Sequence, residues 1–204
     1  MNDHIRVTLQ SILVDPGPVT FSVSMPRTGI LRPLSASQET QLAAFFDALS
    51  SQTRRFYSVT DGRSLAHAHC TSIARYDKLR LVLQDVSQGV IVALVEFSLD
   101  LTGAEVERFA TYGISISPER ACRWGLCVAD KWQRQGVGRE LASASFAIAR
   151  RFGRECVILW GGVHAENANA VQFYRTVGFM EAGRFTNDDG VACIDMLRLG
   201  EMAA

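Results

Sequence analysis

Hydrophobic and polar positions alternate along this chain in two distinct ways. Alternating or continuous apolar runs, which are typical of β-strands, occupy 5–14, 19–25, 29–34, 79–83, 90–97, 124–128, 156–163, 180–185 and 191–199. Apolar residues spaced by three and four, which are typical of helices, occupy 37–49, 51–56, 65–74, 136–152 and 167–177. The chain is therefore predicted to be a mixed α/β protein in which helices cover a sheet.

Several helix ends carry recognisable signals. Ser35 followed by Gln38 is a capping box, which opens the first of these helices. Gly153 and Gly178 stand where the helices over 136–152 and 167–177 should stop. Residues 100–120 are harder to assign, because only 104–110 fits a helix, of one turn or two. The inward-facing residues of the first helix are predicted to be Leu42, Phe45, Phe46 and Leu49.

Composition narrows the classes of protein that the chain can represent. With 204 residues and 48% hydrophobic residues, it can fill the core of one domain, predicted to span 1–204 with 1–26 as an N-terminal strand extension. Its 21 basic and 21 acidic residues balance, so we expect no general attraction to nucleic acid or to membranes. The five cysteines form no C-x-x-C pair, and no secretory or membrane-spanning segment is visible. We therefore expect a soluble, cytoplasmic protein.

Two glycines follow the strand at 124–128 and open the next helix. Backbone N–H groups at a helix start lack intrahelical partners and carry about half a positive charge, and Gly136 and Gly138 let an anion approach them. Arg134 and Arg139 add positive charge nearby. Taken alone, the glycines fit a structural turn equally well. No lysine follows them as in a P-loop, and G-x-G-x-x-G is absent.

A second segment starts at Asn167, after the next buried strand. Asn167 can cap the helix that follows, and Tyr174 lies two turns further along on the same face. On their own, these residues fit a helix cap and the edge of a core.

The two segments in this order resemble the acyl-CoA signature of the GNAT superfamily of N-acetyltransferases. Gln133, Gly136 and Gly138 fit [QR]-x-x-G-x-[GA], and the spacing from Val163 to Phe179 fits V-x-x-x-N-x-x-A-x-x-[FL]-Y-x-x-x-G-F. Arginine is more usual in that family than Gln133, and glycine more usual than Arg134. The resemblance implies an α/β (α+β) fold: a mainly antiparallel sheet of about seven strands, with one splayed parallel pair formed by 124–128 and 156–163.

The same resemblance implies acetyl-CoA as cosubstrate and no metal. It assigns backbone N–H groups of 135–139 to the pyrophosphate and Asn167 to the pantetheine arm. It makes Tyr174 the residue that protonates the departing thiolate. The full set of residues expected to bind the cofactor is Leu126, Val128, Arg134, Gln135, Gly136, Val137, Gly138, Arg139, Asn167 and Tyr174.

The acceptor is predicted only as an amine, either on a small molecule or on a protein lysine or N-terminus. Residues 31–56 bear a looser likeness to GNAT domains of the bacterial protein-acetyltransferase type. A homodimer is possible, because GNAT domains are often dimers. Residues 100–120 are our candidate for shaping the acceptor side.

The general base is the part of this chemistry that the sequence leaves open. Many GNAT enzymes have a glutamate where this chain has Cys122. Glu96, which interrupts the apolar run 90–97, is the best replacement, although it also fits an exposed sheet face. Glu119, Asp130 and ordered water are further options. His67 and His69 complete no metal-ligand pattern.

Two other functional classes fit the same residues. A non-catalytic acyl-CoA-binding sensor or regulatory module would keep the pocket, and Cys122 suits it whereas Tyr174 does not. In a plain interaction domain the glycine turn would be structural only. Binding of acetyl-CoA without turnover would indicate the first class, and failure to bind any CoA derivative would indicate the second.

Overall fold

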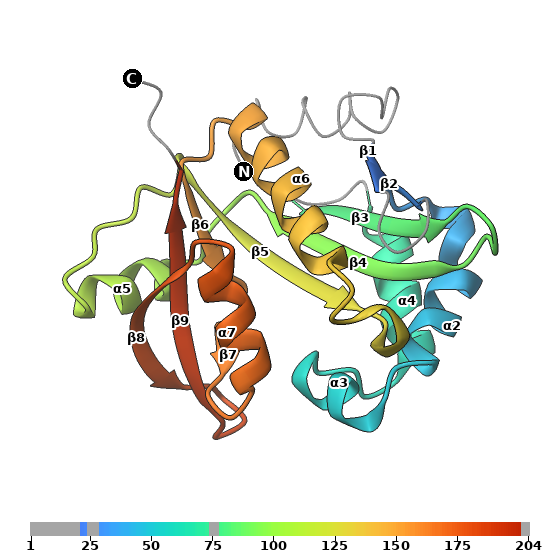
Figure 1. Cartoon of the computed structure of the whole chain (residues 1–204). Helices are drawn as coiled ribbons and strands as arrows, with labels where there is room; N and C mark the ends of the chain where they lie inside the picture. The colour runs from blue at the N-terminus through green and yellow to red at the C-terminus, as the bar shows by residue number, and fades with distance from the viewer. Residues whose placement is uncertain (1–20, 24–28, 74–77, 201–204) are drawn as a thin grey trace. The chain divides into compact units, whose positions relative to one another are not determined.

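A computed structural model describes residues 21–23, 29–73 and 78–200 of the chain. The predicted strand at 5–14, and most of the predicted extension 1–26, lie outside the described residues. The chain, drawn in Figure 1, divides into two compact units, each made of two separate stretches of sequence. The first unit runs up to Phe97 and includes Leu126–Ser145, and the second consists of Ser98–Gly125 and the chain from Phe146 onward. The organisation of 1–204 as one domain therefore stays a prediction.

In the first unit, helices pack on a small sheet. The strands β1 (Phe21–Val23), β2 (Gly29–Pro33), β3 (Lys78–Asp85) and β4 (Ile91–Ser98) follow one another across it, with β1–β2 and β2–β3 antiparallel. The helices are the short 3₁₀ turn η2 (Ala36–Gln38), α2 (Glu39–Asp47), α3 (Ser51–Phe56) and α4 (Gly62–Thr71). The predicted inward residues of the first helix are confirmed in the core, which includes Leu42, Phe45, Phe46, Leu49, Val82 and Leu94.

Local capping explains where these helices begin. The predicted capping box is present, because the Ser35 side chain and the Gln38 side chain each accept a backbone N–H of the other end. Asp61 caps α4 by accepting the Arg63 N–H at 3.0 Å. Gly62 follows it because α4 approaches α2 closely there: an added Cβ would lie 2.9 Å from the Phe46 Cβ.

The second unit contains the only parallel strand pair among the described pairings. Residues Ala121–Trp124 of β5 (Ala121–Val128) pair in parallel with β6 (Cys156–Leu159), and β6 pairs antiparallel with β9 (Ala192–Leu199). The strands β7 (Val163–His164) and β8 (Met180–Thr186) also pair antiparallel with β9. A mixed, mainly antiparallel sheet with one parallel pair was predicted, and this is confirmed. The pairing was placed at 124–128, however, whereas the strand begins at Ala121 and pairs over 121–124.

The long apolar strand predicted over 156–163 is wrong in one respect. It is interrupted after Leu159 and resumes only at Val163 as β7. Gly161 and Gly162 cause the break, because both adopt left-handed backbone conformations, with φ of 73° and 70°. With β7 counted separately, the described residues form nine strands, where about seven were expected.

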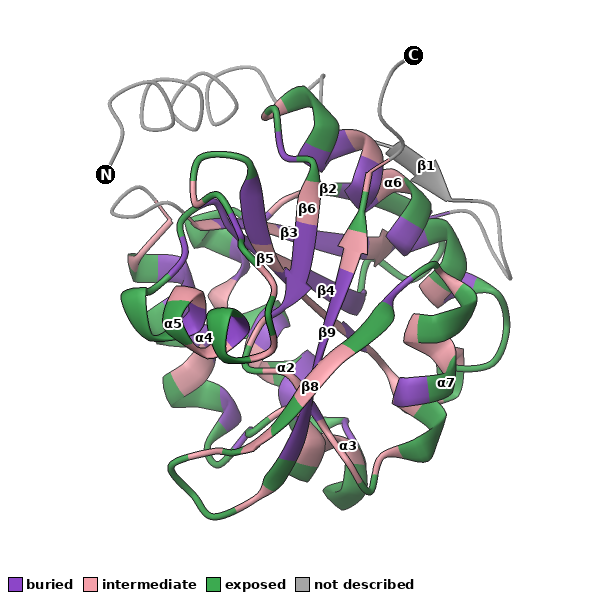
Figure 2. Ribbon diagram, turned by 90° about the vertical axis from the view of Figure 1, so that its left-hand side faces the viewer, coloured by how far each residue is buried: buried purple, intermediate pink, exposed green. Residues whose placement is uncertain are grey.

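Helices cover both faces of the second unit's sheet, as Figures 1 and 2 show. On one face lies α5 (Gly103–Thr111), which packs through Phe109 and its neighbours on Ala121, Ile158 and Leu197. On the other face lies α7 (Ala168–Thr176). Successive side chains of β5 alternate between the two faces. Ala121 therefore belongs to the α5 side, whereas Trp124 packs on Phe146 and Phe179.

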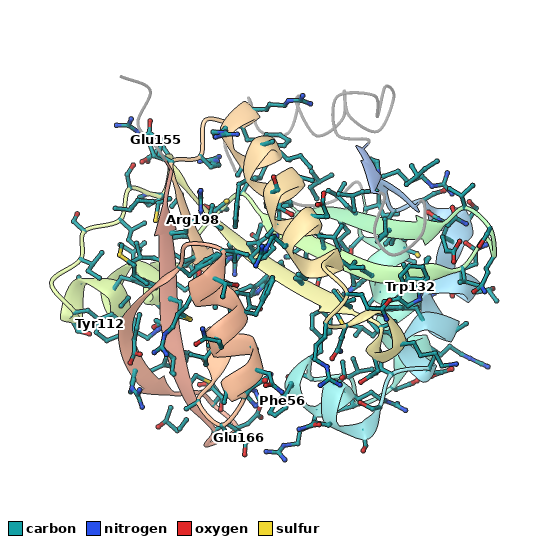
Figure 3. All side chains as sticks on the ribbon, viewed as in Figure 1. Phe56, Tyr112, Trp132, Glu155, Glu166 and Arg198 are labelled. Atoms are coloured by element: carbon teal, nitrogen blue, oxygen red, sulfur yellow. The ribbon has the colours of Figure 1, made fainter. Side chains whose placement is uncertain are left out.

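The short helix predicted over 104–110 is confirmed, and as α5 it extends by one residue at each end. Thr102 and Glu105 form a capping box at its start, with the Thr102 N–H donating to Glu105 Oε2 at 2.8 Å. Tyr112, labelled in Figure 3, lies over β8, where an added Cβ at Gly183 would overlap its ring.

Candidate active site

The glycine turn lies between β5 and α6 (Val137–Arg151), whose first nine residues belong to the first unit. After Val128 the chain forms the 3₁₀ turn η3 (Asp130–Trp132), and Trp132 is labelled there in Figure 3. Gly136 then adopts a left-handed φ of 87°, and its carbonyl is the acceptor for the first helical N–H donors, those of Arg139 and Glu140. This geometry leaves the N–H groups of Val137 and Gly138 at the N-terminal end of α6.

The predicted cofactor-binding residues of this turn differ in what they can offer. The Val137 side chain is fully buried, so this residue can offer a ligand only its backbone N–H. The Arg139 N–H, which was in the predicted set, donates to Gly136 O at 3.0 Å. Arg134, Gln135 and Arg139 have exposed side chains. The turn therefore combines backbone donors with two mobile guanidinium groups.

Arg134 adopts a left-handed conformation that side chains rarely adopt, with φ of 59°. Glycine is the residue that such a position favours, which accounts physically for glycine being usual there in the family that the sequence resembles.

Polar side chains fix the turn to the rest of the first unit. The Gln133 Nε2 group donates to Val128 O at 2.9 Å, and Gln135 Nε2 donates to Lys131 O at 2.5 Å. The Asp130 carboxylate accepts the Ser50 N–H at 2.8 Å and the Thr53 hydroxyl at 2.8 Å, at the start of α3. Partial burial raises the pKa of Asp130, but the hydrogen bonds from Ser50 and Thr53 outweigh it and lower the pKa. Asp130 therefore anchors the start of α3, and its lowered pKa makes it a weaker base than an ordinary carboxylate.

The end of β5 presents alternate residues to different surroundings. Cys127 is buried in the core of the first unit, whereas Leu126 and Val128, the predicted pantetheine contacts, are half-buried. Burial raises the pKa of the Cys127 thiol well above its ordinary value, so this thiol stays neutral and unreactive. The parallel pairing with β6 ends before these residues, with the Trp160 N–H donating to Trp124 O at 2.9 Å.

Asn167 and Tyr174 both lie on α7 in the second unit. The Asn167 side chain accepts the Ala170 N–H at 3.1 Å and caps the helix, as its position predicted. The half-buried Tyr174 ring is held by aromatic contacts, edge-on to Trp124 at 6.0 Å and to Phe179 at 5.6 Å between centroids. The phenol is therefore held in a defined orientation by its ring.

Cys122 cannot replace the glutamate that is common at its position. It is completely buried, and burial raises the pKa of its thiol to about 12. Glu119, a further option considered from the sequence, is exposed and accepts the Ser117 hydroxyl at 2.8 Å. Neither residue offers a buried carboxylate for proton transfer.

Glu96 does not lie on an exposed sheet face; its side chain is only 12% exposed. The Tyr57 hydroxyl donates to Glu96 Oε2 at 2.5 Å, and Arg80 Nε donates to Oε1 at 2.8 Å. His69 Nε2 lies 3.3 Å from the same Oε1. We call these four residues the Glu96 cluster; all belong to the first unit.

The protonation states in the Glu96 cluster follow from burial. Burial raises the pKa of Tyr57 far above its ordinary value, and the nearby Glu96 charge raises it further, so the phenol stays a donor. Burial lowers the pKa of His69 to about 4, against the opposing effect of Glu96, so its imidazole is neutral at pH 7. Arg80 is then the cation that balances Glu96.

Sequence reasoning identified Glu96 but missed Tyr57 and Arg80. One signal was available: Arg80 and Glu96 are opposite charges that interrupt the two apolar runs of one predicted hairpin. Tyr57 gave no local signal, because it reaches Glu96 from the C-terminal end of α3.

The described residues contain no group of three or more His, Cys, Asp or Glu side chains that could hold a metal ion. In the same residues, no helix is long and apolar enough to cross a membrane. His67, considered from the sequence, contacts Glu39 at 3.2 Å on the surface.

Comparison with known proteins places this site in a family. A family model described as the acetyltransferase (GNAT) family matches residues 42–179, which include both signature segments in full. The chain belongs to the GNAT acetyltransferase family, and the resemblance drawn from the signature residues is confirmed. A search of curated proteins found no match.

Solved structures share the fold at low sequence identity. The GNAT domain of S. lividans PAT superposes with a TM-score of 0.66 at 17% identity, covering 89% of this chain and 97% of its own. Spermidine N-acetyltransferase from Vibrio cholerae, solved with CoA and spermine, gives 0.62 at 19% identity, covering 84% and 95%. Aminoglycoside acetyltransferase AAC(6')-Ib, solved with coenzyme A and kanamycin, gives 0.65 at 14% identity, covering 83% and 93%.

Proposed function

We propose that this protein transfers an acetyl group from acetyl-CoA to an amine acceptor through a ternary complex. The observation that carries the proposal is the turn that opens α6. There a left-handed Gly136 precedes a helix N-terminus in a chain of the GNAT family. Such a terminus suits a pyrophosphate, because oriented N–H groups and the helix dipole both favour negative charge.

The cofactor contacts are assigned to the residues that the family signature implies. The N–H groups of Val137 and Gly138 bind the pyrophosphate, and the exposed Arg134 and Arg139 supply cationic charge beside it. The half-buried Leu126 and Val128 offer backbone to the pantetheine arm. Asn167 contributes from the start of α7. Gln135 shapes the turn through its bond to Lys131 O.

Tyr174 and Glu96 carry the proton transfers. As the amine nitrogen bonds to the thioester carbon and the C–S bond breaks, Tyr174 gives its proton to the leaving thiolate. A phenol with an ordinary pKa near 10 transfers a proton to a thiolate whose acid has a pKa near 8.5 at a cost of about 2 kcal/mol, which a general acid can meet. Glu96 accepts the proton that the acceptor nitrogen loses and returns it to solvent.

The acceptor is proposed as an amine, with protein lysines and N-termini tested first. Residues 31–56 support this choice by their likeness to the protein-acetyltransferase type, and one structural neighbour is the GNAT domain of a PAT. Other neighbours are named for spermidine and for aminoglycosides, so small polyamines and amino sugars form the second group of the screen.

Calorimetric titration with acetyl-CoA tests the cofactor assignment. The matched variants are Gly136→Glu and Gly153→Glu. Both positions are left-handed, with φ of 87° and 67°, and they flank opposite ends of α6. We expect a micromolar Kd, about −7 to −8 kcal/mol, for the natural protein and for Gly153→Glu. The Gly136→Glu protein should show no binding, because a side chain and a negative charge occupy the pyrophosphate position.

Equal loss of binding in both variants would mean that backbone strain, and not the position, is responsible. A flat titration of the natural protein with acetyl-CoA and longer acyl-CoAs would overturn the proposal. Release of free CoA in the presence of the amine panel then measures turnover.

One observation favours a second function, an acyl-CoA-binding sensor without turnover. Cys122, at the position where a catalytic glutamate is common, is fully buried with a thiol pKa of about 12. Tight acetyl-CoA binding without CoA release for any amine would support this alternative.

A further inference from the structure

The Glu96 cluster contains donors that the acetyl-transfer chemistry has not yet used. They come from three elements around β4: Tyr57 from the residue that ends α3, His69 from α4 and Arg80 from β3. Each oxygen of the Glu96 carboxylate has its own donor, Tyr57 on Oε2 and Arg80 on Oε1. The carboxylate is therefore fixed in rotation as well as in position.

The two donors are themselves held in place. The Tyr57 ring stacks on the buried Phe46, with 6.5 Å between centroids. Arg80 donates a second hydrogen bond, from Nη1 to Ser72 Oγ at 3.2 Å. A donor that is held on both sides transmits its own position to the group it contacts.

The backbone beside Tyr57 supports a role beyond packing. Ser58, the next residue, has a left-handed φ of 55° without being a glycine. Such conformations are strained and persist where the surrounding structure requires them. Here the reversal ends α3 directly after the tyrosine, with the Val59 N–H donating to Arg54 O at 2.8 Å.

Four groups face the Glu96 carboxylate. They are the Tyr57 phenol from α3, the His69 imidazole from α4, the Arg80 guanidinium from β3 and the Cys127 thiol from β5. The phenol, the imidazole and the thiol are neutral at pH 7, as argued above. Glu96 thus keeps one counterion and one neutral phenol donor, and its side chain retains 12% exposure.

We propose that Tyr57 is a positioning residue for acetyl transfer, whose hydroxyl holds Glu96 in the orientation that accepts the acceptor's proton. The inference rests on the proposed function. In the step, an N–H bond of the acceptor nitrogen breaks, its proton bonds to a Glu96 oxygen, and the freed lone pair bonds to the thioester carbon. The C–S bond then breaks, and the thiolate leaves with the proton that Tyr174 gives it; Tyr174 regains a proton from solvent. Tyr57 keeps its own proton throughout.

The experiment compares Tyr57→Phe with a matched control, Tyr112→Phe. Tyr112 makes the same kind of bond in the second unit, donating to the Asp195 carboxylate at 3.0 Å beside an arginine. The readout is kcat and KM for the best amine, determined separately, together with KM for acetyl-CoA. Glu96→Gln is the reference, because it keeps the shape of the side chain and removes its basicity.

For Tyr57→Phe we expect kcat for the amine to fall about tenfold, as for loss of a hydrogen bond to a charged group. A misdirected carboxylate slows proton transfer without weakening amine binding, so KM for the amine should stay within about twofold. KM for acetyl-CoA should also stay within about twofold. Tyr112→Phe should keep the natural kcat, and Glu96→Gln should lose most of it.

Each other outcome contradicts the inference in a recognisable way. An unchanged kcat in Tyr57→Phe, with Glu96→Gln inactive, would remove the role of Tyr57 alone. A Glu96→Gln protein with the natural kcat would remove the role of the whole cluster and leave acetyl transfer in place. Absence of turnover by the natural protein with every amine would contradict the proposed function, and this inference with it.

Discussion

Two buried carboxylates in this protein are each held by a tyrosine and an arginine, one in each unit. Asp195, in the second unit, accepts Arg108 Nε at 2.6 Å and Nη2 at 3.1 Å. It also accepts the Tyr112 hydroxyl, and its side chain is 1% exposed. Glu96, in the first unit, meets Arg80 through a single nitrogen and remains 12% exposed.

The two carboxylates are held by the same residue types in different geometries. The guanidinium of Arg108 engages both oxygens of Asp195 in a fork, the arrangement that gives arginine pairs their geometric specificity. We call Asp195, Arg108 and Tyr112 the closed set. Arg108 lies in α5, Tyr112 is the residue that ends α5, and Asp195 lies in β9, so the closed set fastens α5 to the sheet. The Glu96 cluster leaves more of its carboxylate exposed and includes a neutral imidazole, which is compatible with the proton transfer proposed for Glu96.

The largest expected effect comes from breaking the closed set. Asp195→Asn removes the charge that balances Arg108, and loss of one partner of a buried ion pair typically costs about 3–5 kcal/mol. Denaturant unfolding at pH 7 measures this loss. The turnover of the folded fraction should stay unchanged at low temperature. A change in stability below about 1 kcal/mol would mean that the pair does not fasten α5.

The second largest effect is on how the free energy of unfolding depends on pH, and it comes from His69 in the Glu96 cluster. His69 has a pKa of about 4 in the folded protein and about 6.5 when unfolded, so as pH falls the unfolded chain binds a proton first. Its contribution is present above pH 6.5 and is lost as pH falls toward 4, amounting to about 3 kcal/mol in all. Free energies of unfolding measured between pH 7 and 4.5 should therefore fall less steeply in His69→Gln.

The control for this measurement is His67→Gln, because the His67 side chain is 64% exposed on the same helix. It should retain the pH dependence of the natural protein. Identical slopes in the two variants would show that burial of His69 does not govern acid sensitivity.

The smallest effect comes from a third carboxylate that is also paired with arginine, but at the surface. Glu181 lies between Arg184 at 2.8 Å and Arg175 at 3.3 Å, and the arginine side chains are 67% and 51% exposed. Its hydrogen bond from Arg184 lowers the pKa of Glu181. Glu181→Gln should change the free energy of unfolding by less than about 1 kcal/mol, and high salt should remove the difference. A larger, salt-independent loss would mean that burial is not what distinguishes the three sets.

Much of this fold could be predicted because its signals are local. The apolar runs, the capping box at Ser35 and the glycine after α6 each depend on a few neighbouring residues. The break inside 156–163 was missed, since two glycines in an apolar run give the same pattern as a buried strand. The length of helix α5 was left at one turn or two because the apolar pattern of 100–120 is irregular. The capping box formed by Thr102 and Glu105 would have indicated where it begins.

In the candidate site, too, the parts with local signals could be predicted and the parts made by tertiary contacts could not. The glycine turn and α7 were predicted because each signature lies in one short segment. Tyr57 and Arg80 were missed because they meet Glu96 only through tertiary contacts between α3, β3 and β4. The spacing of residues along the chain contains no trace of such contacts, apart from unexpected charges within apolar strands.

The left-handed Arg134 has a consequence for how this sequence can change over time. A glycine there would relax the backbone without loss of any backbone N–H group, so selection for stability alone would favour it. An arginine in that place therefore marks a position where stability and the charge beside the glycine turn oppose each other. Homologous chains should divide into those that keep the charge and those that keep the relaxed backbone.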